Sequence, residues 1–253
     1  MILENRKLCF KNILVLFEDN KLLDIINSGL YSRIIVTSYN QLNLEKFKLR
    51  IKTTSLIDLQ QNQDNIFSKF SDTTRNEISR TYKNNNLEFK FFDQANDESY
   101  QLYQNFEYLQ HRIPIAKPSL KDCVLFGAYY QGKLISAIYV IKTRPYLRIR
   151  SIFSRRLKSS DKELYKVISN ASRRLIWEAC QWGKQERYQS LDMASVNFKN
   201  PKTANITKFK MSFGGEVINE YTYTYTSFAY RLLEKTIKIK KIIFKLKNLF
   251  FKK

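Results

Sequence analysis

Short apolar runs alternate with amphipathic segments in the first part of the chain. The β-branched runs at residues 11–17 (KNILVLF) and 32–37 (SRIIVT) are too short and too continuous for amphipathic helices, so they predict two strands. Residues 21–30 (KLLDIINSGL) lie between them and predict a helix. Residues 53–90 predict a strand and then a helix, because apolar positions recur at roughly helical spacing before an asparagine cluster ends the pattern.

From residue 97 onward the pattern predicts a longer series of elements. Residues 97–112 have helical spacing, residues 123–143 contain two β-rich runs around Gln131-Gly132, and residues 146–154 alternate as a further strand. A long helix with one apolar face follows a Ser/Asp cap within residues 159–186. This part therefore begins as helix, hairpin, strand and long helix.

The end of this series is again short. Residues 188–195 predict a strand, residues 201–215 a short helix ended by glycine, and residues 216–226 a strand with strict alternation. The order from residue 97 is thus helix, strand, strand, strand, long helix, strand, short helix, strand, which is typical of a mixed α/β protein.

The charge of the chain indicates the kind of partner. Lys and Arg number 44 against 23 Asp and Glu, and the formal net charge is +21. This excess favours a polyanion nearby: nucleic acid, an anionic membrane face, a diphosphate-bearing substrate or an acidic carrier protein. Three scattered cysteines and a single histidine argue against a disulfide framework or a zinc cluster, and no apolar run approaches the roughly 20 residues needed to span a bilayer. We therefore expect a reducing, cytoplasmic environment and no structural metal.

The last segment, residues 231–253, has a composition of its own. It contains nine basic residues against Glu234 alone, with a broad stripe of Ile, Leu and Phe between them. A basic amphipathic helix of this kind predicts an interfacial anchor, in which each basic residue near an anionic surface contributes about 1 kcal/mol. A helix docked on its own domain and an RNA-binding segment are the alternatives.

Two motifs resemble those of a known family. After a strand that ends in Asp-Leu, the chain has a Thr-Arg-x-x-Ile element, at Thr74, Arg75 and Ile78. Near the end it has a Phe-Lys-x-x-Phe-Gly-Gly element, at Phe209, Lys210, Phe213, Gly214 and Gly215. Together with the element order, these motifs resemble the FemAB-like branch of the GNAT acyltransferase superfamily, over roughly residues 53 to 230.

The resemblance implies the fold and its division. We expect a mixed α/β, GNAT-like fold in which residues 1–96 form a truncated N-terminal α/β unit. Residues 97–230 would form the complete acyltransferase unit, and residues 231–253 the basic amphipathic tail.

The second motif supplies the first candidate site residues. In the family that the chain resembles, a lysine at the position of Lys210 stabilises developing negative charge, which implies a catalytic Lys210. Lys208, Phe213, Gly214 and Gly215 would contact substrate, the glycines by permitting positive φ where the backbone passes close to the cleft. The alternative is a plain helix end with solvated lysines.

Four further candidates lie outside that motif. The resemblance implies that Arg75 anchors substrate; an ion-paired surface arginine is the alternative. Asp192 ends a strand, where cleft residues gather, and we predict it as catalytic, with a buried carboxylate satisfied by backbone N–H groups as the alternative. His111 suits a general base near neutral pH, or is structural. Tyr223 lines the acceptor site or packs in the core.

The donor site is predicted from charge alone. Acetyl-CoA enzymes of the superfamily have a glycine-rich loop where a strand meets the long helix, so that backbone N–H groups approach the pyrophosphate. The corresponding stretch here, SRRLKSSDKEL, contains no glycine. The phosphate charge would instead meet three side chains, those of Arg155, Arg156 and Lys158.

These inferences predict an acyltransferase without a tightly bound cofactor. The donor would be acyl-CoA, an acyl carrier protein or aminoacyl-tRNA, and the acceptor an amine of a cell-surface saccharide or a lipid-linked precursor. Residues 231–253 would hold the protein on the inner face of the membrane. An aminoacyl-tRNA-dependent transferase of the peptidoglycan type, and a non-catalytic membrane- or RNA-binding module of the same fold, are the alternative functions.

Overall fold

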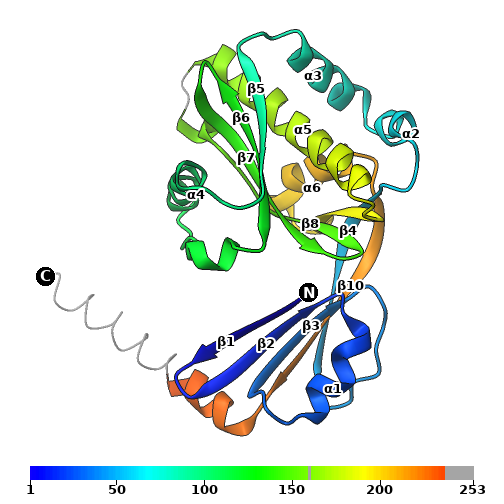
Figure 1. Ribbon diagram of the computed structural model, residues 1–253, viewed down its shortest axis with the longest axis vertical. Helices are drawn as coiled ribbons and strands as arrows, with labels where there is room; N and C mark the ends of the chain where they lie inside the picture. Colours follow the sequence, from blue (N-terminus) through cyan, green and yellow to red (C-terminus); the bar gives the residue numbers. More distant parts are fainter. Residues whose placement is uncertain (159–160, 237–253) are drawn as a thin grey trace, which may run out of the picture. The chain divides into compact units, whose positions relative to one another are not determined.

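The computed structural model describes residues 1–158 and 161–236, with the backbone alone at residues 157 and 158, and it divides into two compact units (Figure 1). One unit comprises Met1–Lys52 and the chain from Asn219 onward, and the other comprises Thr53–Ile218. The chain passes from one unit to the other within strands β4 (Lys48–Asp58) and β10 (Glu216–Thr226).

This division differs from the predicted boundary between residues 96 and 97. Strand β5 (Leu87–Phe92) pairs antiparallel with β6 (Cys123–Tyr130), and helix α3 (Asp72–Tyr82) packs on α5 (Lys162–Gln185). Residues 53–96 therefore belong with the sequence that follows them, because their strand and helix complete its sheet and its core.

The first unit has the strand order β1, β2, β3, β10. Strands β1 (Ile2–Lys7) and β2 (Phe10–Leu16) form an antiparallel hairpin. Helix α1 (Leu22–Asn27) follows the 3₁₀ turn Asp19–Lys21 and connects β2 to the parallel strand β3 (Arg33–Ser38), which β10 joins antiparallel. The strand, helix and strand predicted between residues 11 and 37 are confirmed, whereas β1 was not predicted because its sequence is mostly polar.

The described part of the tail belongs to this first unit. Residues 228–236 are helical, and the buried Tyr230 packs edge-on against Phe10 with ring centroids 5.4 Å apart. Glu234 pairs with Arg33 at 3.1 Å. The folded part thus extends past the predicted boundary at residue 231, while the rest of the predicted anchor, residues 237–253, lies outside the described residues.

The second unit has the strand order β4, β9, β8, β7, β6, β5. Strands β7 (Lys133–Thr143) and β8 (Tyr146–Ser154) continue the antiparallel pairing of β5 and β6, and only β8 and β9 (Ser190–Val196) run parallel. Gln131 and Gly132 both have positive φ, 51° and 74°, as a tight turn between twisted strands requires, so the predicted hairpin is confirmed.

Helices cover both faces of this sheet (Figure 1). Helix α4 (Asp97–Leu109) lies against the face that carries Tyr139, whose hydroxyl donates to Ser99 Oγ at 3.0 Å. The neighbouring Ile138 points to the other face and shares a core with Leu175 of α5. Alternation along β7 therefore separates the two helical layers.

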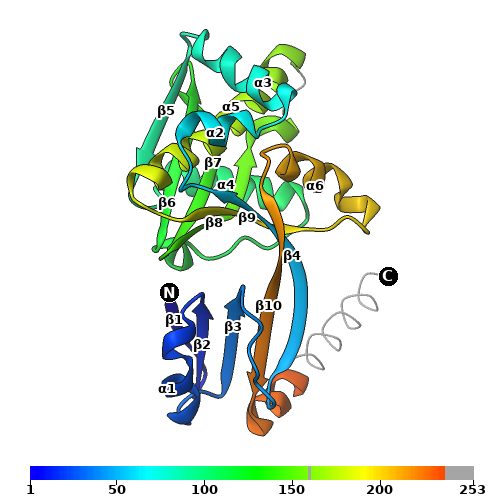
Figure 2. The same cartoon turned by 90° about the vertical axis from the view of Figure 1, so that its right-hand side faces the viewer.

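Three shorter helical segments complete the unit. The helix predicted within residues 53–90 is two helices, α2 (Gln63–Ser68) and α3, because Ser71 caps a new helix by accepting from Thr74 N. Helix α6 (Ala204–Met211) lies beside the end of β9 (Figure 2). The 3₁₀ turns are Lys117–Leu120, Arg155–Lys158 and Pro201–Thr203.

Candidate functional site

The two parallel strands of the second unit pair over only a short stretch. Residues 146–148 of β8 pair with residues 190–192 of β9, and there the ladder ends. Beyond it β8 continues against β7, while β9 continues against β4, with Ser195 opposite Thr54. The strands therefore part after Arg148 and Asp192, and these two residues mark the point of divergence.

Asp192 is held at this point on both carboxylate oxygens. It is fully buried, and its Oδ2 accepts from Arg148 Nη1 at 2.7 Å. Its Oδ1 accepts from Ala194 N at 2.7 Å and from Thr54 Oγ1. The hydrogen bonds of this buried carboxylate therefore link β4, β8 and β9.

Lys210 reaches the same strand from the short helix. Its Nζ donates to Ser195 O at 2.9 Å, and its side chain is half-buried. Asp192 and Ser195, whose carbonyl accepts from Lys210, are three residues apart on β9. Lys208, two positions away on α6, is exposed to solvent.

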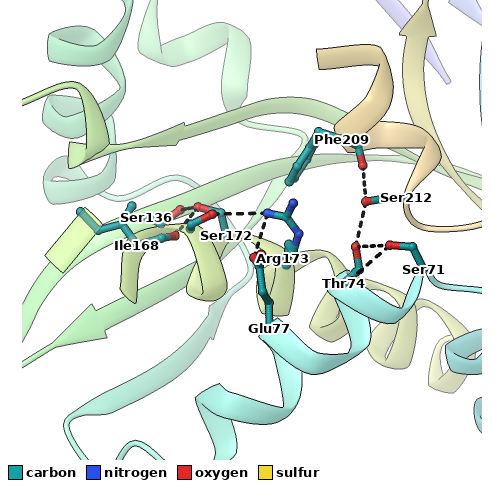
Figure 3. Close-up of polar contacts among 10 residues, drawn as sticks. Ser71, Thr74, Glu77, Ser136, Ile168, Ser172, Arg173, Phe209 and Ser212 are labelled. Atoms are coloured by element: carbon teal, nitrogen blue, oxygen red, sulfur yellow. Dashed lines mark hydrogen bonds and ion pairs between the residues drawn. The ribbon is translucent and has the colours of Figure 1, made fainter. Parts of the chain in front are cut away.

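A chain of hydroxyl contacts fixes α6 to α3 (Figure 3). Thr74 is fully buried, and its Oγ1 donates to Ser212 Oγ at 2.9 Å. Ser212 Oγ donates to Phe209 O at 2.7 Å, and Ser71 N donates to Ser212 O at 2.8 Å. The threonine of the first motif therefore contacts the end of the helix that carries the second motif.

A half-buried arginine of α5 packs against α6. The guanidinium of Arg173 lies over the ring of Phe209, with its carbon 5.1 Å from the ring centroid, and Nη1 pairs with Glu77 at 3.1 Å (Figure 3). Burial lowers the pKa of Arg173 from its usual value. The helix that carries Lys210 is thus held by contacts with both α3 and α5.

Arg75 does not join this group. Its Nη1 donates to Ser68 O at 2.6 Å and Phe70 O at 2.7 Å, and its Nη2 contacts Asp72. The guanidinium thus caps the carbonyls at the end of α2. These contacts account for Arg75 by local structure, and substrate anchoring stays a prediction.

Gly214 and Gly215 are each required for a different steric reason. Gly214 has φ +65°, and a Cβ there would lie 2.2 Å from Lys69 O. A Cβ on Gly215 would lie 2.4 Å from Ser55 Oγ, although the φ of Gly215 is not in the left-handed region. Both close approaches are to the protein's own chain.

Phe213 is fully buried and packs against Phe70 at 5.2 Å between ring centroids. Phe213 and Gly214 also line a cavity of about 370 Å³, together with Tyr146 and Ser190 at the start of β8 and β9. Neither Asp192 nor Lys210 lines this cavity, so contact of Phe213 and Gly214 with substrate stays a prediction.

The surroundings of His111 and Tyr223 differ from those of Asp192 and Lys210. His111 is exposed, with φ +54°, in the turn that ends α4. Tyr223 belongs to the first unit, where it is buried and its hydroxyl accepts from Leu42 N at 2.6 Å. The exposed position of His111 and the buried position of Tyr223 can each be explained without a role in catalysis or substrate binding.

The predicted donor residues have local partners as well. Arg155 Nε donates to Leu134 O at 2.7 Å, and the guanidinium of Arg156 lies 4.0 Å from the centroid of the Tyr165 ring. The side chain of Lys158 lies outside the described residues.

The start of α5 carries its own anionic cap. Asp161 Oδ1 accepts from Glu163 N at 2.8 Å and from Leu164 N at 3.3 Å. These are the backbone groups that would otherwise meet a phosphate at a helix N-terminus.

Sequence reasoning missed Arg148 and Thr54 at the site. Arg148 is a basic residue within an alternating strand, which was the available signal, but its partner lies 44 positions further along the chain. In the part of the chain that the structure describes, no group of His, Cys, Asp and Glu could hold a metal ion. No helix there is long and apolar enough to cross a membrane.

Comparison with known proteins addresses the fold. No family profile and no curated protein matches this chain. The structure of FemX is similar with a TM-score of 0.60 at 9% identity, over 92% of this chain and 86% of FemX. The C-terminal domain of a candidate lysylphosphatidylglycerol synthetase from Agrobacterium fabrum gives 0.58 at 13%, over 94% of this chain and 84% of that one.

L-PGS from Bacillus licheniformis is also similar, with a TM-score of 0.50 at 15% identity, over 86% of this chain and 78% of that one. The chain therefore has the mixed α/β fold of these three structures, and the predicted fold is confirmed. At these identities the likeness establishes the fold alone.

Proposed function

We propose that this chain is an acyl- or aminoacyltransferase that acylates an amine. The observation that carries the proposal is the hydrogen bond from Lys210 to Ser195 O, three residues after Asp192 on β9 and beyond the point where β8 and β9 diverge. A GNAT-like fold supports it, because such folds place an activated acyl group between separated parallel strands. FemX and a lysylphosphatidylglycerol synthetase domain have this fold.

The chemistry needs little from the protein beyond position and charge. The acceptor amine attacks the acyl carbonyl carbon, a C–N bond forms, and the carbonyl oxygen becomes negative. Collapse of this intermediate restores the carbonyl and breaks the bond to the leaving oxygen or sulfur, which takes up the proton that the amine loses. The Lys210 ammonium, oriented by Ser195 O, stabilises the oxyanion.

Asp192 acts in this proposal as a positioning residue. Its carboxylate is fully buried and bound on both oxygens, so it is unsuited to taking a proton from substrate. It holds Arg148 and the end of β9, and the Ser195 carbonyl that orients Lys210 lies three residues further along that strand.

Among the three donors, we favour aminoacyl-tRNA over acyl-CoA. The Asp161 carboxylate occupies the first N–H groups of α5 and would repel a diphosphate placed there. The net charge of +21 suits a nucleic-acid donor. The acceptor we propose is an amine of a cell-surface saccharide or lipid-linked precursor at the inner face of the membrane.

A donor panel tests this proposal. The full chain would be incubated with aminoacyl-tRNA, acyl-CoA and acyl carrier protein donors, with glucosamine and a lipid-linked amino sugar as acceptors, and products identified by mass spectrometry. We expect an amide product with aminoacyl-tRNA. Product with acyl-CoA alone would overturn the donor assignment, and no product with any donor would favour a non-catalytic module.

A further inference from the structure

The loop that follows β9 and the first turn of α6 each expose one large apolar side chain. Phe198 is 64% exposed and Ile206 is 55% exposed. A single exposed apolar residue is ordinary on a protein surface, but two beside one another call for an explanation.

Hydrogen bonds join the backbone beside Phe198 to the side chain beside Ile206, on the first turns of α6. Asn197 N donates to Thr207 Oγ1 at 3.0 Å, and Thr207 Oγ1 donates to Asn197 O at 3.1 Å. Phe198 and Ile206 are each one residue from this contact. The side chain of Asn200 accepts from Lys202 N at 3.0 Å and starts the turn that leads into α6. The backbone that carries the two apolar side chains is therefore fixed by hydrogen bonds.

The charge around the pair has one sign. Lys199, Lys202 and Lys208 are exposed, and none of them has an ion-pair partner among the described residues. The sequence contains no acidic residue between Asp192 and Glu216. We call Phe198, Lys199, Lys202 and Ile206 the loop surface.

We propose that the loop surface binds an anionic phospholipid bilayer. Apolar side chains that enter the interface, surrounded by lysines that meet the headgroups, are the combination that peripheral membrane contacts use. The contact is separate from the predicted anchor in residues 231–253, and it stands whether or not the chain transfers acyl groups. Ile206 is the third residue of α6 and lies one helical turn before Lys210, so this contact places the start of α6 at the lipid surface.

The direct test locates the loop surface in the bilayer. In the full chain, Phe198→Trp is mixed with vesicles of phosphatidylglycerol and brominated phosphatidylcholine, and tryptophan quenching is measured above that of the parent, which contains Trp177 and Trp182. The matched control is Ile113→Trp, because Ile113 is 93% exposed elsewhere in the same unit. We expect added quenching at position 198 only, and less of it without phosphatidylglycerol.

A second set of variants measures the strength of the contact. Lys199→Gln/Lys202→Gln should weaken vesicle binding about 25-fold, from about 1 kcal/mol for each lysine. Phe198→Ser/Ile206→Ser should weaken vesicle binding more than the double lysine variant does. The control Tyr108→Ser/Ile113→Ser should leave vesicle binding unchanged. Equal quenching at positions 198 and 113, or no quenching at either, overturns the proposal. Protection of the loop lysines by RNA but not by vesicles would assign the loop surface to nucleic acid instead.

Discussion

Gly214 and Gly215 show how two neighbouring glycines meet different steric demands. Gly214 needs a positive φ and faces the Lys69 carbonyl, while Gly215 only needs room beside Ser55. Gly214→Ala should destabilise the fold by roughly 2–4 kcal/mol, from overpacking together with left-handed strain. The control is Gly132→Ala, where φ is +74° but no atom lies within 4 Å of the added carbon, so strain alone should cost about 1 kcal/mol. Equal losses in urea unfolding would contradict this account.

The cysteines should differ in reactivity. Cys9 is exposed, whereas Cys123 and Cys180 are buried, and burial raises the pKa of Cys123 to about 12 and that of Cys180 above its usual value. Because only the thiolate reacts, a thiol reagent at pH 8 should label one cysteine rapidly, and Cys9→Ser should abolish that phase. Two or three rapid equivalents in the native protein would show that the core opens readily.

At the residue scale, sequence singled out Lys210 and Asp192 as candidates, but it could not predict the hydrogen-bond partners of Asp192. Lys210 came from a motif and Asp192 from its place at a strand end. Arg148 and Thr54 could not be inferred, because each meets Asp192 across strands that are far apart in sequence. Arg75 was placed by motif, yet its guanidinium binds carbonyls a few residues away.

At the scale of elements, the contact between α3 and α6 gives a testable claim about position. Thr74→Val removes the hydroxyl that meets Ser212, while the valine keeps the shape of the side chain. A displacement of about 1 Å at a reacting group lowers rates by as much as 100-fold, so turnover should fall roughly 10- to 100-fold.

Thr81→Val is the matched control for that change. Thr81 is also buried on α3, but its hydroxyl donates to Ile78 O within its own helix at 2.6 Å. Its loss should reduce unfolding free energy by about 1 kcal/mol and leave turnover nearly unchanged. If the two variants lose turnover equally, the hydroxyl chain does not position α6.

Sequence predicted elements where local signals were strong. The hairpin at Gln131-Gly132 and the long helix α5 follow from turn and cap chemistry. Strand β1 was missed because its sequence is mostly polar, whereas β5 was missed although its apolar and polar residues alternate from Leu87 to Phe91. The break between α2 and α3 was missed because the apolar spacing continues across the new cap at Ser71.

At the scale of the whole molecule, the division into two units could not be predicted as a single boundary in the sequence. The first unit is completed by residues from the far end, so a linear boundary at residue 96 was the wrong kind of prediction for it. Composition gave no sign of this, since β4 and β10 run through the division without a break in pattern.

The helix at residues 228–236 leads to different predictions for two truncated chains. A chain ending at residue 236 keeps Tyr230 against Phe10 and Glu234 beside Arg33, so it should unfold like the full chain. It loses seven of the nine basic residues of the tail, so vesicle binding should weaken and become less sensitive to salt. A chain ending at residue 227 loses a buried tyrosine and should be about 2–4 kcal/mol less stable. If the chain that ends at residue 227 were as stable as the full chain, the helix at residues 228–236 would not be part of the first unit's core.

The central claim is that Lys210 stabilises charge in an acyl transfer, and its most direct test compares two lysines of one helix. With the donor and acceptor that the panel identifies, turnover would be measured for the parent, Lys210→Ala and Lys208→Ala. The account predicts a loss of roughly 100-fold or more in kcat for Lys210→Ala with an unchanged melting transition, and less than about threefold for Lys208→Ala. Turnover of Lys210→Ala close to that of the parent would contradict the account.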